Sequence, residues 1–329
     1  MKTSFKKYGR KDSQDLCEIS LENDHGMQVN ILNYGATLEK VLLNQENMIL
    51  TLNSPEDYSK ERNFLGGTVG RICGRVRLGK WRHGRQIQQL PQNDGKNHIH
   101  GGLGSDTKIW NFKLKNSDRE AQADFFLFDA DGTNGYPGNM KLHATYKLDN
   151  NNNLSYTLTA VSDQLTVFNP ANHTYFNLGE KAADLELQLA ADYYLPVGED
   201  GLPNQGMKNV KNTPFDFRKK KKISLALNSD DDQIKLRNGL DHPFILNGMQ
   251  PAAMLTSKKH QMIMTTNAPA IVMYTANHFN HTGGVANNIG QYDGITLEAQ
   301  CPPAEGIDLG EITLLPYEKF ERKINWNFK

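Results

Sequence analysis

Residues 141–160 read KLHATYKLDNNNNLSYTLTA, and this stretch decides the class of fold. Apolar side chains occupy alternate positions on both sides of a polar segment: Leu142, Ala144, Tyr146 and Leu148 before it, and Leu154, Tyr156, Leu158 and Ala160 after it. A period of two places every second side chain on the same face of a strand. The asparagine-rich segment 149–153 is typical of a turn. The stretch therefore predicts an antiparallel pair of half-buried strands.

The same alternation recurs towards both ends of the chain. A hairpin is predicted where two apolar runs flank the turn at residues 23–26: Cys17, Ile19 and Leu21, then Met27, Val29 and Ile31. Phe320, Ile324, Trp326 and Phe328 predict a C-terminal strand.

One short helix is predicted over residues 55–60, with Ser54 as its N-cap and Pro55 at the first helical position. Long amphipathic helical patterns are absent from the sequence. We therefore expect an all-β fold, a large antiparallel β-sandwich with few short helices, formed by residues 1–329 as a single domain.

Charge and cysteine content narrow the classes of partner. The 329 residues include 37 basic and 37 acidic side chains, so no whole-molecule field would attract nucleic acid or an anionic membrane. No apolar run has the length of a membrane span or the form of a signal peptide, which predicts a soluble, cytoplasmic protein. Cys17, Cys73 and Cys301 are far apart and odd in number, as expected of reduced thiols, and none has an obvious activating neighbour in the sequence.

The segment FNPANHTYFNLG, residues 168–179, sets His173 among polar and aromatic neighbours. A half-desolvated imidazole titrates near neutral pH and can act as a general acid or base. The alternative is a core histidine that hydrogen-bonds a backbone carbonyl. This segment alone leaves both interpretations open.

A second candidate lies in YDGITLEAQCPP, residues 292–303. In a strand that turns Ile295, Leu297 and Ala299 to the core, the opposite face carries Thr296, Glu298 and Gln300. Glu298 would then be partly desolvated, which suits a general base.

Two further segments combine glycine with basic residues. Residues 63–81 carry Arg71, Arg75 and Arg77, which indicates either a phosphate site or arginines paired with carboxylates at a sheet rim. The P-loop pattern is missing. In NHIHGG, residues 97–102, His98 and His100 could begin a metal site, although a hydrogen-bonding histidine in a ligand-approachable loop is favoured.

Asp241 lies in GLDHPF, residues 239–244, where a carboxylate precedes a histidine in a turn. From these residues alone, Asp241 is equally well explained as a turn former or as a ligand contact.

Taken together, seven motifs resemble the aldose 1-epimerases, also called galactose mutarotases, and they span nearly the whole chain in the family's order. They are GRICGRVRLGKW (70–81), NHIHGG (97–102), DGTNGYPGN (131–139), NPANHTYFNLG (169–179), TPFDFR (213–218), GLDHPF (239–244) and YDGITLEAQ (292–300). The resemblance implies a galactose mutarotase-like supersandwich with an open groove that binds a hexose.

The resemblance also implies a role for individual residues. Glu298 would be the general base that removes the proton from the anomeric hydroxyl, and His173 the general acid that protonates the ring oxygen. His100 and Arg75 would hydrogen-bond sugar oxygens near the reacting end, and Asp241 would bind hydroxyls further round the ring. The implied mechanism needs no cofactor and no metal.

Two positions depart from the family pattern. Gly74 stands where many members have asparagine, and Val272 where relatives can carry a sugar-binding glutamine. Both changes affect binding rather than proton transfer, so the sugar stays open between galactose, glucose and maltose.

Two other functions stay open, and so does the oligomeric state. One is a hexose-6-phosphate 1-epimerase, in which Arg71, Arg75, Arg77 or Lys80 would contact phosphate. The other is a non-catalytic carbohydrate-binding protein of the same fold. The sequence does not decide whether the chain forms a homodimer.

Overall fold

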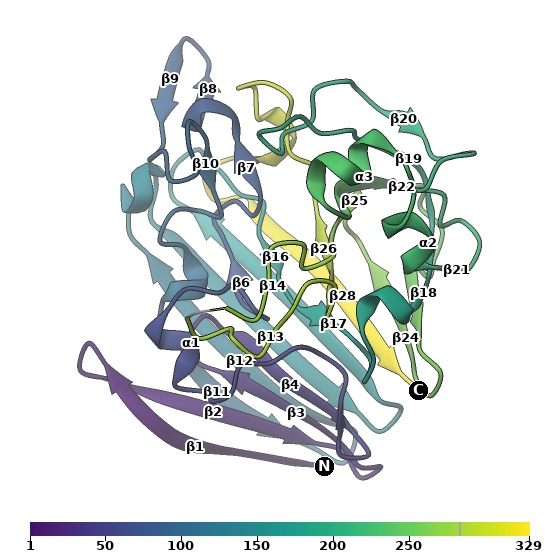
Figure 1. The fold of residues 1–329 in the computed structure, drawn as a ribbon. Helices are drawn as coiled ribbons and strands as arrows, with labels where there is room; N and C mark the ends of the chain where they lie inside the picture. Colours follow the sequence, from purple (N-terminus) through teal and green to yellow (C-terminus); the bar gives the residue numbers. More distant parts are fainter. Residues whose placement is uncertain (283) are drawn as a thin grey trace.

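The computed structural model describes residues 1–282 and 284–329, and antiparallel sheets dominate it (Figure 1). The largest sheet has nine strands, in the order β11 (Asn111–Asn116), β12 (Glu120–Asp129), β13 (Met140–Asp149), β14 (Asn153–Ser162), β28 (Lys319–Phe328), β24 (Gln261–Thr266), β23 (Ala253–Thr256), β18 (Glu186–Leu189) and β21 (Lys221–Lys222). The predicted strand pair is β13 and β14, with Leu142 opposite Ala160 and Tyr146 opposite Tyr156. The predicted C-terminal strand is β28, which lies between β14 and β24.

Two other sheets pack against the nine-stranded sheet. The N-terminal sheet is ordered β1 (Lys2–Lys11), β2 (Gln14–Glu22), β3 (Met27–Leu32), β4 (Thr37–Leu43) and β5 (Glu46–Asn47). A six-stranded sheet is ordered β17 (Tyr175–Phe176), β26 (Ile295–Gln300), β25 (Ala270–Tyr274), β22 (Asp241–Leu246), β19 (Ala191–Tyr194) and β20 (Lys208–Asn209). The predicted N-terminal hairpin is β2 and β3, with Ile19 opposite Ile31.

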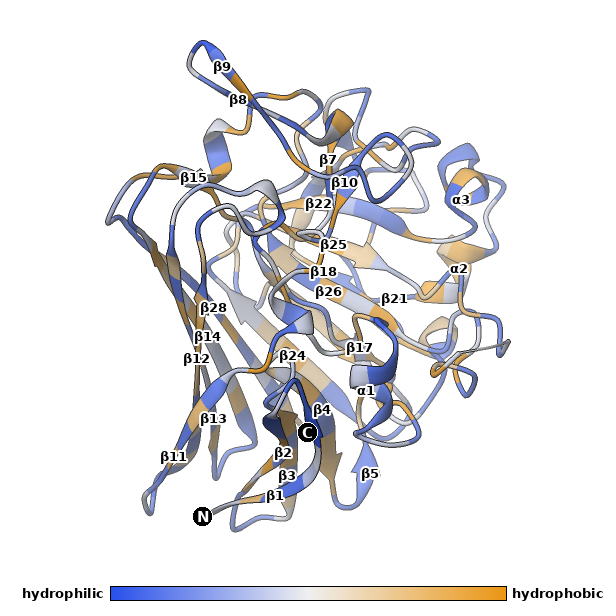
Figure 2. Ribbon diagram, turned by 90° about the vertical axis from the view of Figure 1, so that its left-hand side faces the viewer, coloured by the Kyte–Doolittle hydropathy of each residue, from blue (hydrophilic) through white to orange (hydrophobic). Residues whose placement is uncertain are grey.

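Figure 2 shows the layers from the side, with β11 to β14 along the left and β25, β26 and β17 in a layer to their right. One continuous cluster of buried side chains fills the space between the sheets and draws on all three of them, including Ile19, Val29, Phe125, Tyr146, Trp326, Met273 and Leu297. Burial of this apolar surface is the main favourable contribution to folding. The predicted all-β sandwich is confirmed.

The helices are short: α1 (Asp57–Lys60), α2 (Ile223–Leu227) and α3 (Asp232–Arg237). The prediction of a helix near residue 55 was right in place but wrong in detail. α1 begins at Asp57, and the Ser54 hydroxyl donates to Asp57 Oδ2 instead of capping the helix backbone. In the parts of the chain that the structure describes, none of the helices has the length and apolar character required to cross a membrane.

Short two-stranded ribbons join separate segments of the chain: β6 (Thr68–Val69) with β16 (Ala171–Asn172), β7 (Arg75–Val76) with β10 (His98–Ile99), and β15 (Thr166–Val167) with β27 (Thr313–Leu314). β8 (Lys80–His83) and β9 (Gln86–Gln89) form a local hairpin. The first ribbon brings segment 63–81 beside the His173 segment, and the second brings it beside NHIHGG. Three motifs recognised separately in the sequence therefore meet.

Candidate active site

All five site residues named from the sequence line one cavity of about 280 Å³. They are Arg75, His100, His173, Asp241 and Glu298. Phe64, Tyr175, Tyr274 and Phe279 add aromatic surface to the same cavity. A concave site with apolar walls and a few converging polar groups is the usual form of a small-molecule site.

Strand pairing brings His173 and Glu298 together. In the antiparallel pair β17 and β26, Tyr175 lies opposite Thr296, so the same register continued by two residues sets His173 opposite Glu298. His173 Nε2 lies 3.3 Å from Glu298 Oε1. Both side chains are nearly buried, at 4% and 3% exposure. An imidazole and a carboxylate in this arrangement can exchange protons with a bound molecule.

Three donors hold the Glu298 carboxylate. Thr296 Oγ1 donates to Oε1 at 2.9 Å, and Gln300 Nε2 donates to Oε2 at 3.0 Å. These two residues flank Glu298 on one face of β26, as predicted from the alternation. The third donor is Cys73 Sγ, 3.3 Å from Oε2. A buried carboxylate requires such partners, because an unpaired charge in the interior is costly.

Sequence reasoning missed Cys73. Burial, followed by the charge of Glu298, raises the pKa of the Cys73 thiol well above its ordinary value, so the thiol is protonated and donates. The sequence contains no obvious activating neighbour for Cys73, because Glu298 lies 225 residues further along the chain. Its position two residues before Arg75 is the one local signal that could have suggested a role.

Backbone contacts fix the position of His173. Its N–H donates to the Gly67 carbonyl and its carbonyl accepts from Gly66 N–H, both at 3.0 Å. Gly66 has a φ of +65° and its Cα approaches the Leu38 backbone so closely that a Cβ would lie 1.9 Å from the Leu38 carbonyl oxygen. Glycine is therefore required beside the histidine. Within the described residues, His173 Nδ1 is buried without a hydrogen-bond partner.

His100 contacts His173 edge to face, with ring centres 5.4 Å apart. Its Nδ1 accepts from Gly74 N–H at 3.2 Å, which leaves the proton of a neutral ring on Nε2. Burial, with a smaller contribution from His173 and the nearby arginines, lowers the pKa of His100 well below its ordinary value. His100 is thus a neutral hydrogen-bond donor at neutral pH. The favoured interpretation of NHIHGG, a hydrogen-bonding histidine in a loop at the ligand, agrees with this geometry.

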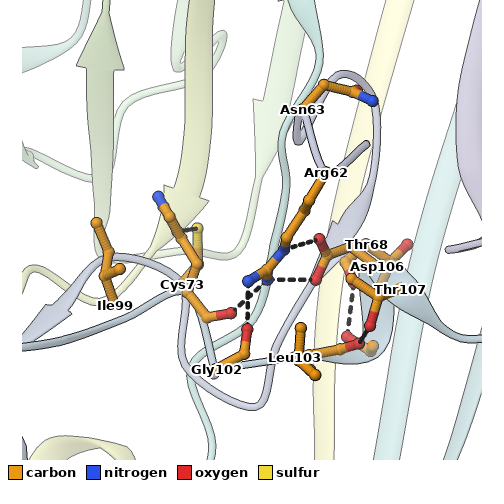
Figure 3. A network of polar contacts seen from close by, with 12 residues as sticks. Arg62, Asn63, Thr68, Cys73, Ile99, Gly102, Leu103, Asp106 and Thr107 are labelled. Atoms are coloured by element: carbon orange, nitrogen blue, oxygen red, sulfur yellow. Dashed lines mark hydrogen bonds and ion pairs between the residues drawn. The ribbon is translucent and has the colours of Figure 1, made fainter. Parts of the chain in front are cut away.

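Arg62 supports the His100 loop, and sequence reasoning did not find it. Its guanidinium binds both Asp106 oxygens at 2.7 Å, donates to the His100 carbonyl at 2.7 Å, and also donates to the Gly102 carbonyl. Figure 3 shows Arg62 reaching between Asp106 and Gly102. The same group lies 4.4 Å from the ring centre of Phe64, a wall of the cavity. Arg62 therefore connects the loop that holds His100 to the aromatic wall.

Asp241 and Arg75 each form an ion pair with a neighbouring side chain. Asp241 Oδ2 accepts from Arg237 at 2.6 Å and 3.1 Å, and Arg75 Nε donates to Asp94 at 2.7 Å. These contacts orient the Asp241 carboxylate and the Arg75 guanidinium. Both residues still line the cavity.

The arginine triplet of segment 63–81 does not form a common anion site. Arg71 is buried and paired with Asp129 at 2.7 Å, and Arg77 is paired with Asp200 at 3.3 Å. Of the two interpretations that the sequence left open for these arginines, the structure shows the pairing with carboxylates. Of the three arginines, Arg75 is the one that lines the cavity.

His98 and His100 have different environments, although they are two residues apart. His98 is fully buried, and its two ring nitrogens contact the Pro91 carbonyl and the Tyr136 hydroxyl, each at 2.7 Å. The metal site considered for this pair from the sequence is therefore not formed by these two side chains.

A β-sandwich with a buried imidazole–carboxylate pair inside a polar and aromatic cavity defines a site for acid–base chemistry on a small molecule. A family model described as Aldose 1-epimerase matches residues 18–326. The chain belongs to the aldose 1-epimerase family.

Individual relatives agree with this assignment. A crystal structure of a galactose 1-epimerase from Lactobacillus acidophilus NCFM is 70% identical, with a TM-score of 0.98, and the match covers 100% of this chain and 98% of that one. The aldose 1-epimerase of Haemophilus influenzae is 35% identical over 87% of this chain and 86% of that protein. The galactose mutarotase of Mus musculus is 29% identical over 87% and 85%.

Proposed function

We propose that this sugar epimerase interconverts the α and β anomers of a free aldohexose, with Glu298 as the base and His173 as the acid. The contact of 3.3 Å between these two side chains is the observation that carries the proposal. The two oxygens that exchange protons, the anomeric hydroxyl and the ring oxygen, are bonded to the same carbon. A base and an acid that serve them must therefore be neighbours.

The proposed reaction begins when Glu298 removes the proton of the anomeric hydroxyl while His173 donates a proton to the ring oxygen. The bond between C1 and the ring oxygen breaks, and the open-chain aldehyde forms. Rotation about the C1–C2 bond presents the other face of the carbonyl. The same two groups with exchanged roles then close the ring, so each regains its initial protonation state.

Three other residues are proposed to bind the sugar. The protonated Nε2 of His100 and the guanidinium of Arg75 supply donors to sugar oxygens, and donors of this kind also stabilise charge that develops during ring opening. Asp241, oriented by Arg237, supplies an acceptor for hydroxyl groups. The continuous core shared by the three large sheets supports the further proposal that residues 1–329 act as a single domain.

Galactose is the first candidate sugar, because the solved Lactobacillus acidophilus relative is described as a galactose 1-epimerase. Glucose and maltose remain alternatives, since Gly74 and Val272 both line the cavity without offering a polar side chain. A 6-phosphate substrate is less well supported. Arg71 and Arg77 are paired with carboxylates, and Arg75 is itself paired with Asp94.

The test is polarimetry of freshly dissolved α-galactose, α-glucose and maltose in the presence of a chelator. Glu298→Gln and His173→Gln are each expected to slow mutarotation by about 10²- to 10⁴-fold, the usual contribution of a positioned acid or base. Glu186→Gln, on β18 of the nine-stranded sheet, is the matched control and should retain full activity.

Retained activity in Glu298→Gln would contradict the assigned base. Sugar binding without any acceleration by the wild-type chain would favour a carbohydrate-binding protein. Faster turnover of the 6-phosphate than of the free sugar would favour the hexose-6-phosphate epimerase.

A further inference from the structure

We propose that Cys73, His100 and His173 form a binding site for Zn²⁺ at the wall of the cavity, and that an ion bound there blocks the epimerase reaction. One ligand atom from each residue lies within 4.8 Å of the others. The site is distinct from the His98 and His100 pair considered from the sequence, because His98 is committed to Pro91 and Tyr136.

The spacing of the ligand atoms suits a tetrahedral ion. Zn²⁺ binds sulfur at about 2.3 Å and imidazole nitrogen at about 2.0 Å, so adjacent sulfur and nitrogen ligands of a tetrahedral ion lie about 3.5 Å apart. Cys73 Sγ and His100 Nδ1 are 3.6 Å apart. The ligand atom of His173 lies within 4.8 Å of the other two.

The two imidazoles differ in how readily they can bind a cation, because His100 Nδ1 would have to give up the hydrogen bond from Gly74 N–H. The Nδ1 atom of His100 faces Cys73 Sγ. In the described part of the chain, His173 Nδ1 is a buried nitrogen without a hydrogen-bond partner, and its Nε2 has Glu298 alongside. Zn²⁺ binds well to imidazole and thiolate ligands, whereas Mg²⁺ and Ca²⁺ favour oxygen ligands.

Glu298 favours a cation at this position. Its carboxylate is 3.3 Å from Cys73 Sγ and 3.3 Å from His173 Nε2, so it offers negative charge, and one of its oxygens or a water can complete the tetrahedron. Binding converts the Cys73 thiol into a zinc thiolate and releases one proton to solvent. Arg62 and Arg75 oppose the ion, but they are paired with Asp106 and Asp94, and the Glu298 carboxylate lies beside the site.

The expected consequence is inhibition that competes with sugar. The ion would lie against the cavity that the sugar enters, and a Glu298 oxygen bound to zinc could not remove the proton of the anomeric hydroxyl. The inhibition part of this inference rests on the proposed function, whereas the binding part does not.

Binding is tested first, without any activity measurement. The wild-type chain, kept reduced with a phosphine, is titrated calorimetrically with Zn²⁺ against a competing chelator, and separately with Co²⁺ in a spectrophotometer. We expect one ion per chain and a thiolate-to-cobalt charge-transfer band. Cys73→Ser keeps a donor to Glu298 but removes the thiolate. Because loss of even an outer-shell partner typically costs about 10- to 100-fold in metal affinity, this variant should bind Zn²⁺ at least about 10²-fold more weakly.

Cys301→Ala is the matched control, since Cys301 is half-buried and lies outside the cluster. It should bind Zn²⁺ like the wild type. An unchanged Zn²⁺ affinity in Cys73→Ser, or a cobalt spectrum without the charge-transfer band, would overturn the site. If Cys73→Ser folds poorly by circular dichroism, Cys73→Ala gives the same comparison.

Inhibition is then measured by polarimetry, with the rate of each variant expressed relative to its own zinc-free rate. Zn²⁺ should raise the apparent KM of the wild type, and a stronger chelator should restore the rate. Inhibition that persists undiminished in Cys73→Ser would contradict the inference. A chain that binds Zn²⁺ as expected but accelerates no mutarotation would contradict the proposed function and leave the metal site standing.

Discussion

Strands β14 and β26 belong to different sheets and are buried in different ways. In β14, buried and partly exposed residues alternate along the strand, so one face packs on the core and the other faces solvent. In β26 all six residues are buried, although Thr296, Glu298 and Gln300 are polar. Glu298 and Gln300 on the second face of β26 line the cavity, and Glu298 contacts Cys73 and His173.

This difference in burial distinguishes β14, which belongs to the scaffold, from β26, which carries part of the candidate active site. Apolar alternation is sufficient to build β14, because its outer face needs no partner other than water. Burying the polar face of β26 requires partners for each side chain, and these come from Cys73 and from neighbours two residues away. In this protein, a strand whose polar and apolar residues alternate but are all buried, β26, is the strand that holds Glu298 in the candidate active site.

The comparison predicts that Leu158→Ala damages stability and leaves chemistry intact. Leu158 is 1% exposed in the core face of β14. Removing its side chain should lower the free energy of unfolding by about 2–5 kcal/mol, measured by urea denaturation. Thr159→Ala, on the other face, should change it by less than about 0.5 kcal/mol. A changed KM in Leu158→Ala would show that the two sheets are not independent.

His242, in β22 of the six-stranded sheet, predicts a pH-dependent stability. Burial lowers the pKa of His242 to about 4, and its Nδ1 accepts from Asp241 N–H, as a neutral ring requires. Above pH 6.5 the ring is neutral in both states and the effect is absent. As pH falls from about 6.5 towards about 4, the unfolded chain gains the proton first, so stability should fall by about 3 kcal/mol.

Urea denaturation at several pH values checks this prediction against His242→Gln. The variant should show a flatter dependence over that range, because it lacks the titrating ring. Parallel curves for the two proteins would contradict the prediction.

Arg62→Lys tests whether the loop beside the polar face of β26 must be held rigidly. Lysine keeps the charge but cannot bind Asp106 and two carbonyls at once. We expect kcat/KM to fall by about 10²-fold, as for displacement of a catalytic loop by about 1 Å. Arg119→Lys, at an exposed turn, is the matched control. A purely structural role would lower stability without changing kcat or KM.

Val272→Gln should have the smallest effect. Val272 lies opposite Glu298 in the pair β25 and β26 and lines the cavity. An added amide can supply one hydrogen bond, worth about 1 kcal/mol, so the ratio of kcat/KM for galactose and glucose should shift by less than about tenfold. Polarimetry with both sugars measures the ratio. An equal change for the two sugars would show that this position does not select between them.

Local patterns predicted the elements of the scaffold well. The strand pair around residue 150, the N-terminal hairpin and the C-terminal strand all formed as expected, because a period of two in apolar residues admits few other structures. The start of α1 was misplaced by two residues, since Ser54 had a side-chain partner in Asp57 that competes with capping.

The sequence by itself determined the all-β class, the strand pairs and, through its motifs, five of the residues that line the cavity. It could not identify Arg62 or Cys73, or show that β28 lies at the centre of the largest sheet. Arg62 contacts a carbonyl 38 residues away, and Cys73 a carboxylate 225 residues away. Apolar periodicity is a property of neighbouring residues, so the chain displays it directly. A hydrogen bond between distant segments exists only once the sheets have packed, so tertiary structure alone decided that Cys73 contacts Glu298.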